Sequence, residues 1–126
     1  MLKKIINAIQ TDRLFFKGQK STKSGDYTAS INFYDKAITI SPAASWIYLH
    51  KAISLAKSGL YEGAIELVNT AIKINDKKHA YFLYLGIFNF DIEKYDEAEN
   101  AFKKSLELSP NNTLVTSYLN LINVIN

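Results

Sequence analysis

The sequence predicts an all-α protein built from repeated helical hairpins, and three observations support this prediction. First, the stretch Gly59–Ile74 recurs at one fixed spacing, upstream as Gly25–Ile40 and downstream as Glu93–Leu108. Second, apolar residues follow helical spacing, and no segment alternates as a strand would. Third, Gly or Pro stands near most predicted helix ends. A fixed period of this length indicates one supersecondary unit that is stacked to bury a continuous core.

Local signals divide the chain into helices. Gly25 is a good residue just beyond a helix end, and Asp26 is a good N-cap for the helix that follows it. Pro42 and Pro110 end helices because the residue before Pro is pushed out of the α region. We expect a short lead-in helix over 1–10, able to continue into the next, and helices over 12–24, 27–40, 44–58, 61–74, 78–92, 95–108 and 113–125.

The lead-in segment is amphipathic, with its apolar residues on one stripe. Its simplest interpretation is a cap over the open end of the array, and the alternative is a basic membrane anchor. That alternative is weak because the segment has only two Lys and two turns of stripe.

Small residues recur where two antiparallel helices must approach each other. Gly18 faces Ser30 in the first predicted hairpin, and the next two hairpins repeat the pattern. Bulky residues fill the space between the helices, and a third small residue marks where the next hairpin docks. The full sets are Gly18, Ala52, Gly86; Ser30, Ala64, Ala98; Leu14, Tyr48, Phe82; and Ala37, Ala71, Ser105.

This pattern resembles the tetratricopeptide repeat (TPR). The shared features are the period of about 34 residues, a bulky residue before Gly or Ala, Gly-x-Tyr at the turn, Ala-x-x-x-Phe/Tyr-x-x-Ala on the second helix, and a final Pro. Asp76 and Glu93 depart from the pattern, in place of Pro and the turn Gly. The resemblance implies a right-handed superhelical array of antiparallel helix pairs, with three TPR units and a C-terminal capping helix. The expected single domain, 1–126, divides into 1–10, 11–44, 45–78, 79–112 and 113–126, the last being a cap or a partial fourth repeat.

The resemblance also implies that the first helix of each unit lines a concave groove that binds a segment of a partner. The predicted binding residues are Phe15, Gln19, Trp46, Leu49, His50, Ile53, Leu83, Tyr84, Ile87 and Phe90. Trp46 is the expected anchor, because Trp is enriched among binding hot spots. The alternative is that much of this stripe is core, covered by residues 1–10 or by neighbouring helices.

The best-known members of the family clamp the acidic C-terminal tails of heat-shock chaperones with Lys, Arg and Asn. The matching positions here are Phe15, Gln19, His50, Ala80 and Tyr84. None of these carries a fixed positive charge, and carboxylate recognition needs charge-assisted donors. We therefore expect a partner other than the acidic chaperone tail, namely an amphipathic helix or an apolar extended segment.

The last predicted helix, 113–125, is apolar on several sides, and such a helix is normally buried. Three explanations remain open: it packs on the third unit and tolerates exposure, it self-associates, or the natural chain continues. The candidate self-association residues are Leu114, Tyr118, Leu121, Ile122 and Ile125.

Composition argues against several classes of function. Net charge is only +3, and 14 Lys accompany a single Arg, so we expect no nucleic-acid binding. There is no Cys, and His50 and His79 stand far apart in the sequence, so no metal, cofactor or catalytic site is expected. The N-terminus is too polar for a signal peptide and no apolar run spans a membrane, which favours the cytoplasm. We predict a non-catalytic protein-binding module or scaffold, or alternatively a self-associating repeat protein.

Overall fold

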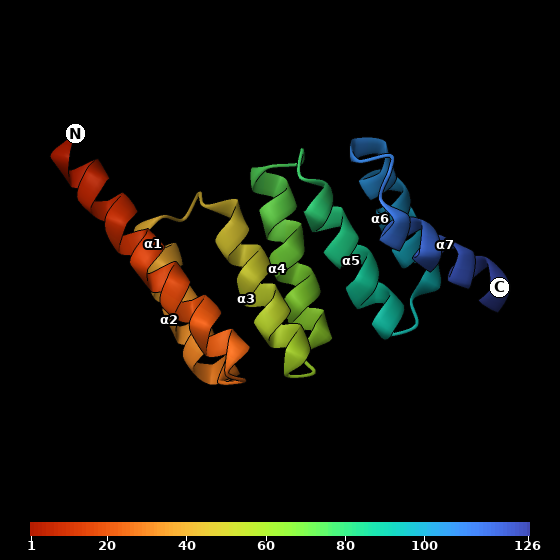
Figure 1. The fold of residues 1–126 in the computed structure, drawn as a ribbon, viewed down its shortest axis with the longest axis horizontal. Coiled ribbons are helices and arrows are strands. Elements are labelled where there is room, and N and C mark those ends of the chain that lie inside the picture. Colours follow the sequence, from red (N-terminus) through yellow and green to blue (C-terminus); the bar gives the residue numbers. More distant parts are fainter.

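The protein is an array of seven α-helices in the computed structural model, which describes all 126 residues. The helices run side by side as antiparallel pairs, with the two termini at opposite ends of the array (Figure 1). This confirms the predicted all-α fold. The helices are α1 (Leu2–Lys23), α2 (Tyr27–Ile40), α3 (Ser45–Lys57), α4 (Tyr61–Ile74), α5 (His79–Asp91), α6 (Tyr95–Leu108) and α7 (Thr113–Ile125).

The predicted turns between paired helices are present. Asp26 caps α2, since its carboxylate accepts a hydrogen bond from the Ala29 amide at 3.0 Å. Gly25 and Gly59 take φ values of +82° and +85°, which glycine adopts without strain. Glu93 takes the equivalent turn position with a φ of +64° despite its side chain. Glu93 in place of the usual glycine therefore leaves the turn conformation unchanged.

The lead-in segment does not cover the array. Residues 2–10 are the first turns of one continuous helix, α1, and they project past α2 (Figure 1). Thr11 is the first buried residue of α1, and its Oγ1 lies 2.7 Å from Ser41 Oγ, just after the end of α2. The apolar side chains that precede Thr11 are all exposed. The predicted cap over the open end is therefore wrong, because no second helix reaches that far.

In the first and third hairpins, the close contact joins a glycine on the first helix to an aromatic ring on the second. A Cβ atom at Gly18 would lie 2.4 Å from the Tyr34 ring, and one at Gly86 would lie 2.4 Å from the Phe102 ring. Both rings are fully buried. The second unit has Ala52 and Val68 at these positions, so a larger residue faces a smaller one.

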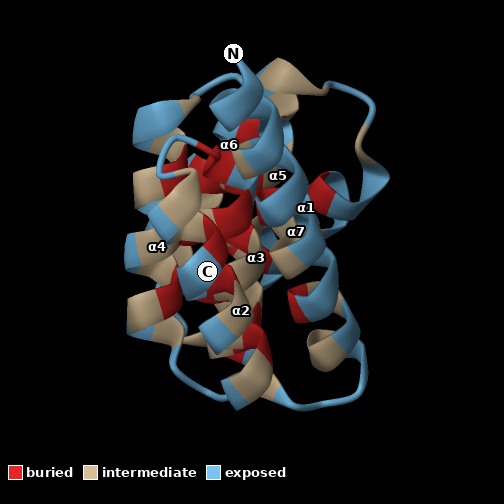
Figure 2. Ribbon diagram, turned by 90° about the vertical axis from the view of Figure 1, so that its left-hand side faces the viewer, coloured by how far each residue is buried: buried red, intermediate tan, exposed pale blue.

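The two junctions between hairpins differ in chemistry. Between the first and second hairpins, Ser54 Oγ lies 3.0 Å from Thr22 Oγ1 and 2.9 Å from Ser30 Oγ. Between the second and third, the residue equivalent to Ser54 is Phe88, whose ring lies 6.3 Å from that of Tyr61. At this position hydroxyl groups meet at the first junction and aromatic rings at the second, which also has one buried hydroxyl contact, between Ser45 and Tyr81 at 2.7 Å. The core runs through the array between the two layers of helices (Figure 2).

Val68→Phe should destabilise the protein, because the equivalent rings stand over Gly and this one would stand over Ala52. Overpacking of this kind costs about 1–3 kcal/mol. Adding Ala52→Gly should recover part of the loss, although Gly within a helix itself costs about 1 kcal/mol. Urea unfolding of the two single variants and the double variant gives the coupling free energy. Strictly additive changes would mean that the two side chains do not share one space.

Candidate functional site

The odd-numbered helices carry a continuous row of partly exposed side chains. Viewed along the array, α1, α5 and α7 lie on the opposite side from α4 and α6 (Figure 2). We call the exposed surface of the odd-numbered helices the odd-helix face. It contains Phe15, Gln19, His50, Ile53, Tyr84 and Ile87, all of them half-buried.

A hollow of about 150 Å³ opens on this face between α1 and α3. We call it the α1–α3 pocket. Its lining residues are Gln19, Thr22, Lys23, Tyr34, His50 and Ile53. Thr22 Oγ1 donates to the Gly18 carbonyl at 3.0 Å and lies 3.4 Å from the Tyr34 hydroxyl, within reach of Ser54. The pocket floor is therefore held by hydroxyl contacts from three helices.

His50 forms one wall of the pocket and is held by aromatic contacts. Its ring meets the Phe15 ring edge-on with centroids 4.8 Å apart, and the Tyr34 ring lies 6.3 Å away. Burial lowers the pKa of the His50 imidazole below its ordinary value, so the ring is uncharged at neutral pH. The Lys23 ammonium is the positive charge on the pocket lining, and the Gln19 amide is a neutral donor.

The α5 part of the odd-helix face adjoins α7. Leu83, Ile87 and Phe90 pack against the buried cluster that includes Val115 and Ile122. Next to this cluster, burial raises the pKa of the Asp91 carboxyl above its usual value. Burial also raises the pKa of the Tyr118 hydroxyl, and the negative charge of Asp91 raises it further. This end of the face is thus apolar, with one carboxylate at its edge.

Two of the predicted site residues lie in the core. Leu49 is only 6% exposed, within the cluster that contains Ala52 and Val68, so it cannot meet a partner on the surface. Ile122, proposed for self-association, is fully buried among Ala98, Phe102 and Val115. Both predictions are wrong for one reason: a helix that packs on two neighbours buries more than one stripe.

The remaining predicted residues keep exposed surface. Trp46 is 45% exposed and lines a hollow of about 610 Å³ with Ser45, Ile74 and Tyr81, at the start of α3 rather than beside the α1–α3 pocket. Its role as an anchor stays a prediction. Tyr84 lies half-buried, 5.9 Å from Phe88 between ring centroids.

The predicted binding residues leave out three residues of the pocket, namely Thr22, Lys23 and Tyr34. Thr22 lies one turn after Gln19 on the same face of α1, so helical spacing alone could have indicated it. Tyr34 comes from the second helix of the unit, and no pattern within α1 or α3 points to it. Its hydroxyl reaches the pocket only because Gly18 leaves room for the ring.

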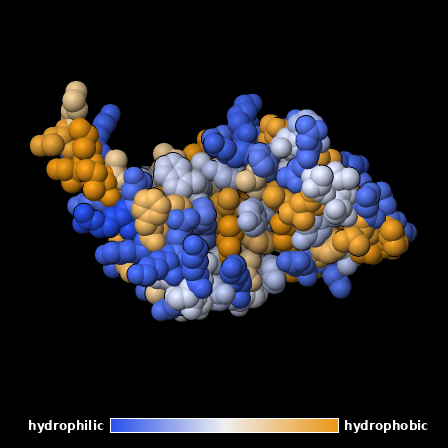
Figure 3. Space-filling model, viewed as in Figure 1, coloured by the Kyte–Doolittle hydropathy of each residue, from blue (hydrophilic) through white to orange (hydrophobic).

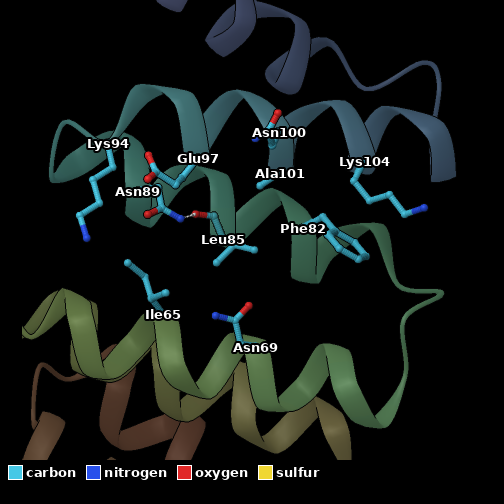
Figure 4. Close-up of a pocket in the computed structure, with 10 residues that line it drawn as sticks. All are labelled: Ile65, Asn69, Phe82, Leu85, Asn89, Lys94, Glu97, Asn100, Ala101 and Lys104. Carbon is cyan, nitrogen blue, oxygen red and sulfur yellow. Dashed lines mark hydrogen bonds between the residues drawn. The ribbon is translucent and has the colours of Figure 1, made fainter.

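A third hollow lies on the other side of the array, between α4 and α6. It measures about 500 Å³, and Figure 4 shows Ile65 and Asn69 of α4 facing Lys94, Glu97 and Lys104 across it. Its walls combine polar side chains with Ile65 and Ala101, and Phe82 and Leu85 of α5 line it as well. It lies away from the odd-helix face, so a variant in it is a suitable control for binding at that face.

No metal site or membrane-spanning helix is present. No three His, Asp or Glu side chains come together closely enough to hold a metal ion. None of the helices is both long enough and apolar enough to cross a bilayer.

Comparison with known proteins gives the family. Residues 23–105 match the family model described as anaphase-promoting complex, cyclosome, subunit 3. The chain belongs to this family of tetratricopeptide repeats. One relative is the small glutamine-rich tetratricopeptide repeat-containing protein 2 of Mycosarcoma maydis, 29% identical over 84% of this chain and 30% of that protein. Another is the Hsp70-Hsp90 organising protein of Plasmodium falciparum (isolate 3D7), 32% identical over 86% of this chain and 19% of that one. The chain thus spans less than a third of either relative.

A solved structure corrects the prediction about acidic tails. The first TPR of Spaghetti (RPAP3), bound to the HSP90 peptide SRMEEVD, superposes with a TM-score of 0.88 and 26% identity over 92% of this chain and 94% of that one. A similar module therefore binds an acidic peptide, and our prediction that excluded the acidic chaperone tail was wrong. That prediction compared single positions, whereas Lys23, one turn beyond Gln19, adds a cationic side chain to the lining of the same pocket.

Lowering the pH from 7.5 to 5.5 should destabilise the protein through His50. Its pKa is lower in the folded than in the unfolded state, so the unfolded chain takes up a proton first as pH falls through about 6.5. His50→Gln should remove that part of the loss. Urea unfolding at both pH values measures it, and His79→Gln, at the exposed start of α5, is the matched control. Equal losses in the protein and the His50 variant would contradict this assignment.

Proposed function

We propose that this chain is a non-catalytic protein-interaction module that binds an extended peptide segment of a partner across its odd-helix face. The observation that carries the proposal is the α1–α3 pocket, which opens beside a row of half-buried apolar side chains on a rigid floor. Within this proposal the chain binds a partner and catalyses no reaction. The relatives described above are named as repeat-containing and organising proteins.

The dimensions favour an extended peptide. A hollow of about 150 Å³ holds one side chain or a terminal carboxylate and is small beside the roughly 300–1,000 Å³ of small-molecule sites. Packed helices lie about 8–10 Å apart, and an extended chain advances about 3.3 Å per residue. Successive odd-numbered helices pack mainly on the even-numbered helices between them, so an extended peptide that crosses them needs at least about three residues to reach each new helix.

The donors of the pocket favour an acidic group. The Lys23 ammonium and the Gln19 amide both border the hollow, and hydrogen bonds from a cation to a carboxylate are about twice as strong as neutral ones. The apolar residues Phe15 and Ile53 beside them favour an aliphatic neighbour in the peptide. The heptapeptide SRMEEVD, which the similar RPAP3 module binds, combines these features and is our first probe.

Fluorescein-labelled SRMEEVD should bind the protein, and Gln19→Ala or Lys23→Ala should weaken binding about ten- to hundredfold. A hydrogen bond to a charged group contributes about 1.5–3 kcal/mol, which corresponds to this range. Fluorescence polarisation at low salt measures the affinity. Asn69→Ala, in the hollow between α4 and α6, is the control and should leave binding unchanged. Absence of binding by the folded protein, or equal loss in all three variants, would overturn the proposal.

A second candidate function, self-association, is favoured by the projecting start of α1. The exposed fractions of Leu2, Ile5, Ile6 and Ile9 are 71%, 52%, 45% and 53%, and they form an apolar patch at one end of the molecule (Figure 3). Exposed apolar patches mark interaction sites in many proteins. A matching stripe on a second copy would cover this one in a symmetric helix pair.

Light scattering after gel filtration should show a dimer of the 14.2 kDa chain only at high concentration. Two helical turns supply less than the roughly 800 Å² per partner of a stable interface. Ile5→Ser with Ile9→Ser should give a monomer at every concentration, whereas Lys3→Ser with Lys4→Ser should not. A monomer throughout the dilution series of the unchanged protein would exclude this candidate.

A further inference from the structure

Tyr118 and Leu121 of α7 occupy positions that form the odd-helix face in the other odd-numbered helices, and Leu114 lies one turn before Tyr118 on the same side of α7. Val124 and Ile125, near the end of α7, are also exposed. A step of one repeat period takes Ala80, Tyr84 and Ile87 of α5 to Leu114, Tyr118 and Leu121 of α7. Leu114 is 49% exposed and Leu121 is 51% exposed. The apolar surface of α7 therefore follows those of α1, α3 and α5 as a fourth set of residues, one repeat period after the residues of α5.

The side of α7 on which a helix of a further unit would pack is mostly polar, although Val124, one turn after Asn120, is an exposed apolar residue there. The positions that match Phe82 and Gly86, which meet the second helix of the third unit, are Thr116 and Asn120, and both are exposed. The apolar side of α7 is thus not the side on which a helix of a fourth unit would pack. It faces the same way as the candidate binding surface.

Packing makes the surfaces of α5 and α7 continuous. The Tyr118 ring stacks on Phe102 with centroids 4.8 Å apart and meets Phe90 edge-on at 5.1 Å. Leu83 and Ile87 of α5 pack against the cluster that anchors α7. Leu114 and Leu121 therefore extend the apolar row of α5, and the right-hand end of the molecule in Figure 3 shows an apolar patch over α7.

Charge separates the two ends of the odd-helix face. Lys23 borders the α1–α3 pocket, and Lys57, also exposed, ends α3. At the other end, α5 finishes with Asp91, and α7 carries no charged side chain. An acidic segment therefore favours the α1–α3 end, and an apolar segment without acidic residues favours the α5–α7 end.

We propose that α7 is the fourth helix of the peptide site, and that Leu114, Tyr118 and Leu121 bind apolar side chains that precede the acidic end of the same peptide. This inference rests on the proposed function and names the partner more closely. The partner segment has an acidic C-terminal end and aliphatic residues about seven to twelve positions before it. An extended heptapeptide spans at most about 25 Å, whereas α7 lies two to three helix spacings of about 10 Å from the pocket. SRMEEVD is therefore too short to cover α7 fully.

The test compares three labelled peptides. GLIGLISRMEEVD carries an apolar extension, GSSGSSSRMEEVD carries a polar one of equal length, and SRMEEVD carries none. The apolar extension should tighten binding about tenfold or more, and the polar extension less than about twofold. Leu114→Ser with Leu121→Ser should abolish the gain and leave the affinity for SRMEEVD unchanged. Thr116→Ala with Asn120→Ala, on the polar side of α7, is the matched control, and circular dichroism checks the fold of both variants.

Three results would overturn the inference. Equal tightening by both extensions would make it a length effect. A gain that survives in the Leu114 and Leu121 variant would place the apolar residues elsewhere. Conversion of a dimer to a monomer by that variant, without loss of the gain, would assign the face to a second copy.

Failure of the proposed function appears separately, as absence of SRMEEVD binding to the unchanged protein. In that case GLIGLISRMNNVN with an amidated end tests α7 alone. Binding that Leu114→Ser with Leu121→Ser removes supports the inference without an acidic end, and no binding overturns it.

Discussion

The architecture depends on the contact between Gly18 and Tyr34 in the first hairpin and its counterpart between Gly86 and Phe102 in the third. A methyl group at either glycine would lie 2.4 Å from ring carbon atoms that have no space to move into. The two helices of each pair are thus as close as their backbones and one aromatic ring permit. In the second hairpin, Ala52 takes the place of the glycine and Val68 takes the place of the aromatic residue. The distance between the paired helices follows from this contact.

This contact also connects the core to the surface. The Tyr34 ring can come this close to α1 only because residue 18 has no side chain, and its hydroxyl then reaches Thr22. Thr22 in turn lies within hydrogen-bond distance of Ser54 on the next hairpin. One packing choice therefore sets the floor of the α1–α3 pocket and links two hairpins. At the next junction Phe88 takes the place of Ser54, and no equivalent polar pocket forms.

The two halves of the odd-helix face differ in chemistry. Its first half presents polar and cationic groups above a hydroxyl network, and its second half presents aliphatic and aromatic groups beside α7. If this face binds a peptide as proposed, the gradient favours one direction of the bound chain, because a reversed peptide would place its acidic end against Asp91 and Leu121. Direction, as well as composition, is then part of what the surface recognises.

The sequence by itself determined the helices and their register. The bounds 27–40, 61–74, 95–108 and 113–125 agree with α2, α4, α6 and α7, because glycine, Asp26 and the prolines act on the neighbouring backbone. The equivalence of positions one repeat period apart likewise needs no coordinates. It is why the small residues at the helix contacts could be named in advance, although the structure places Tyr34, and not the predicted Ser30, against Gly18.

Only the tertiary structure decided which of those positions reach solvent. Leu49 and Ile122 carry the same helical spacing as their exposed neighbours, yet contacts with adjacent helices bury them. Residues 2–10 form a helix as expected, but they lie beyond the end of α2 because α1 is longer than α2. The pocket joins Gln19 and His50 to a ring from a third helix, and Lys23, one turn after Gln19, also lines it. The spacing of residues along one helix shows which of them share a face, whereas burial and pockets depend on which other helices pack beside it.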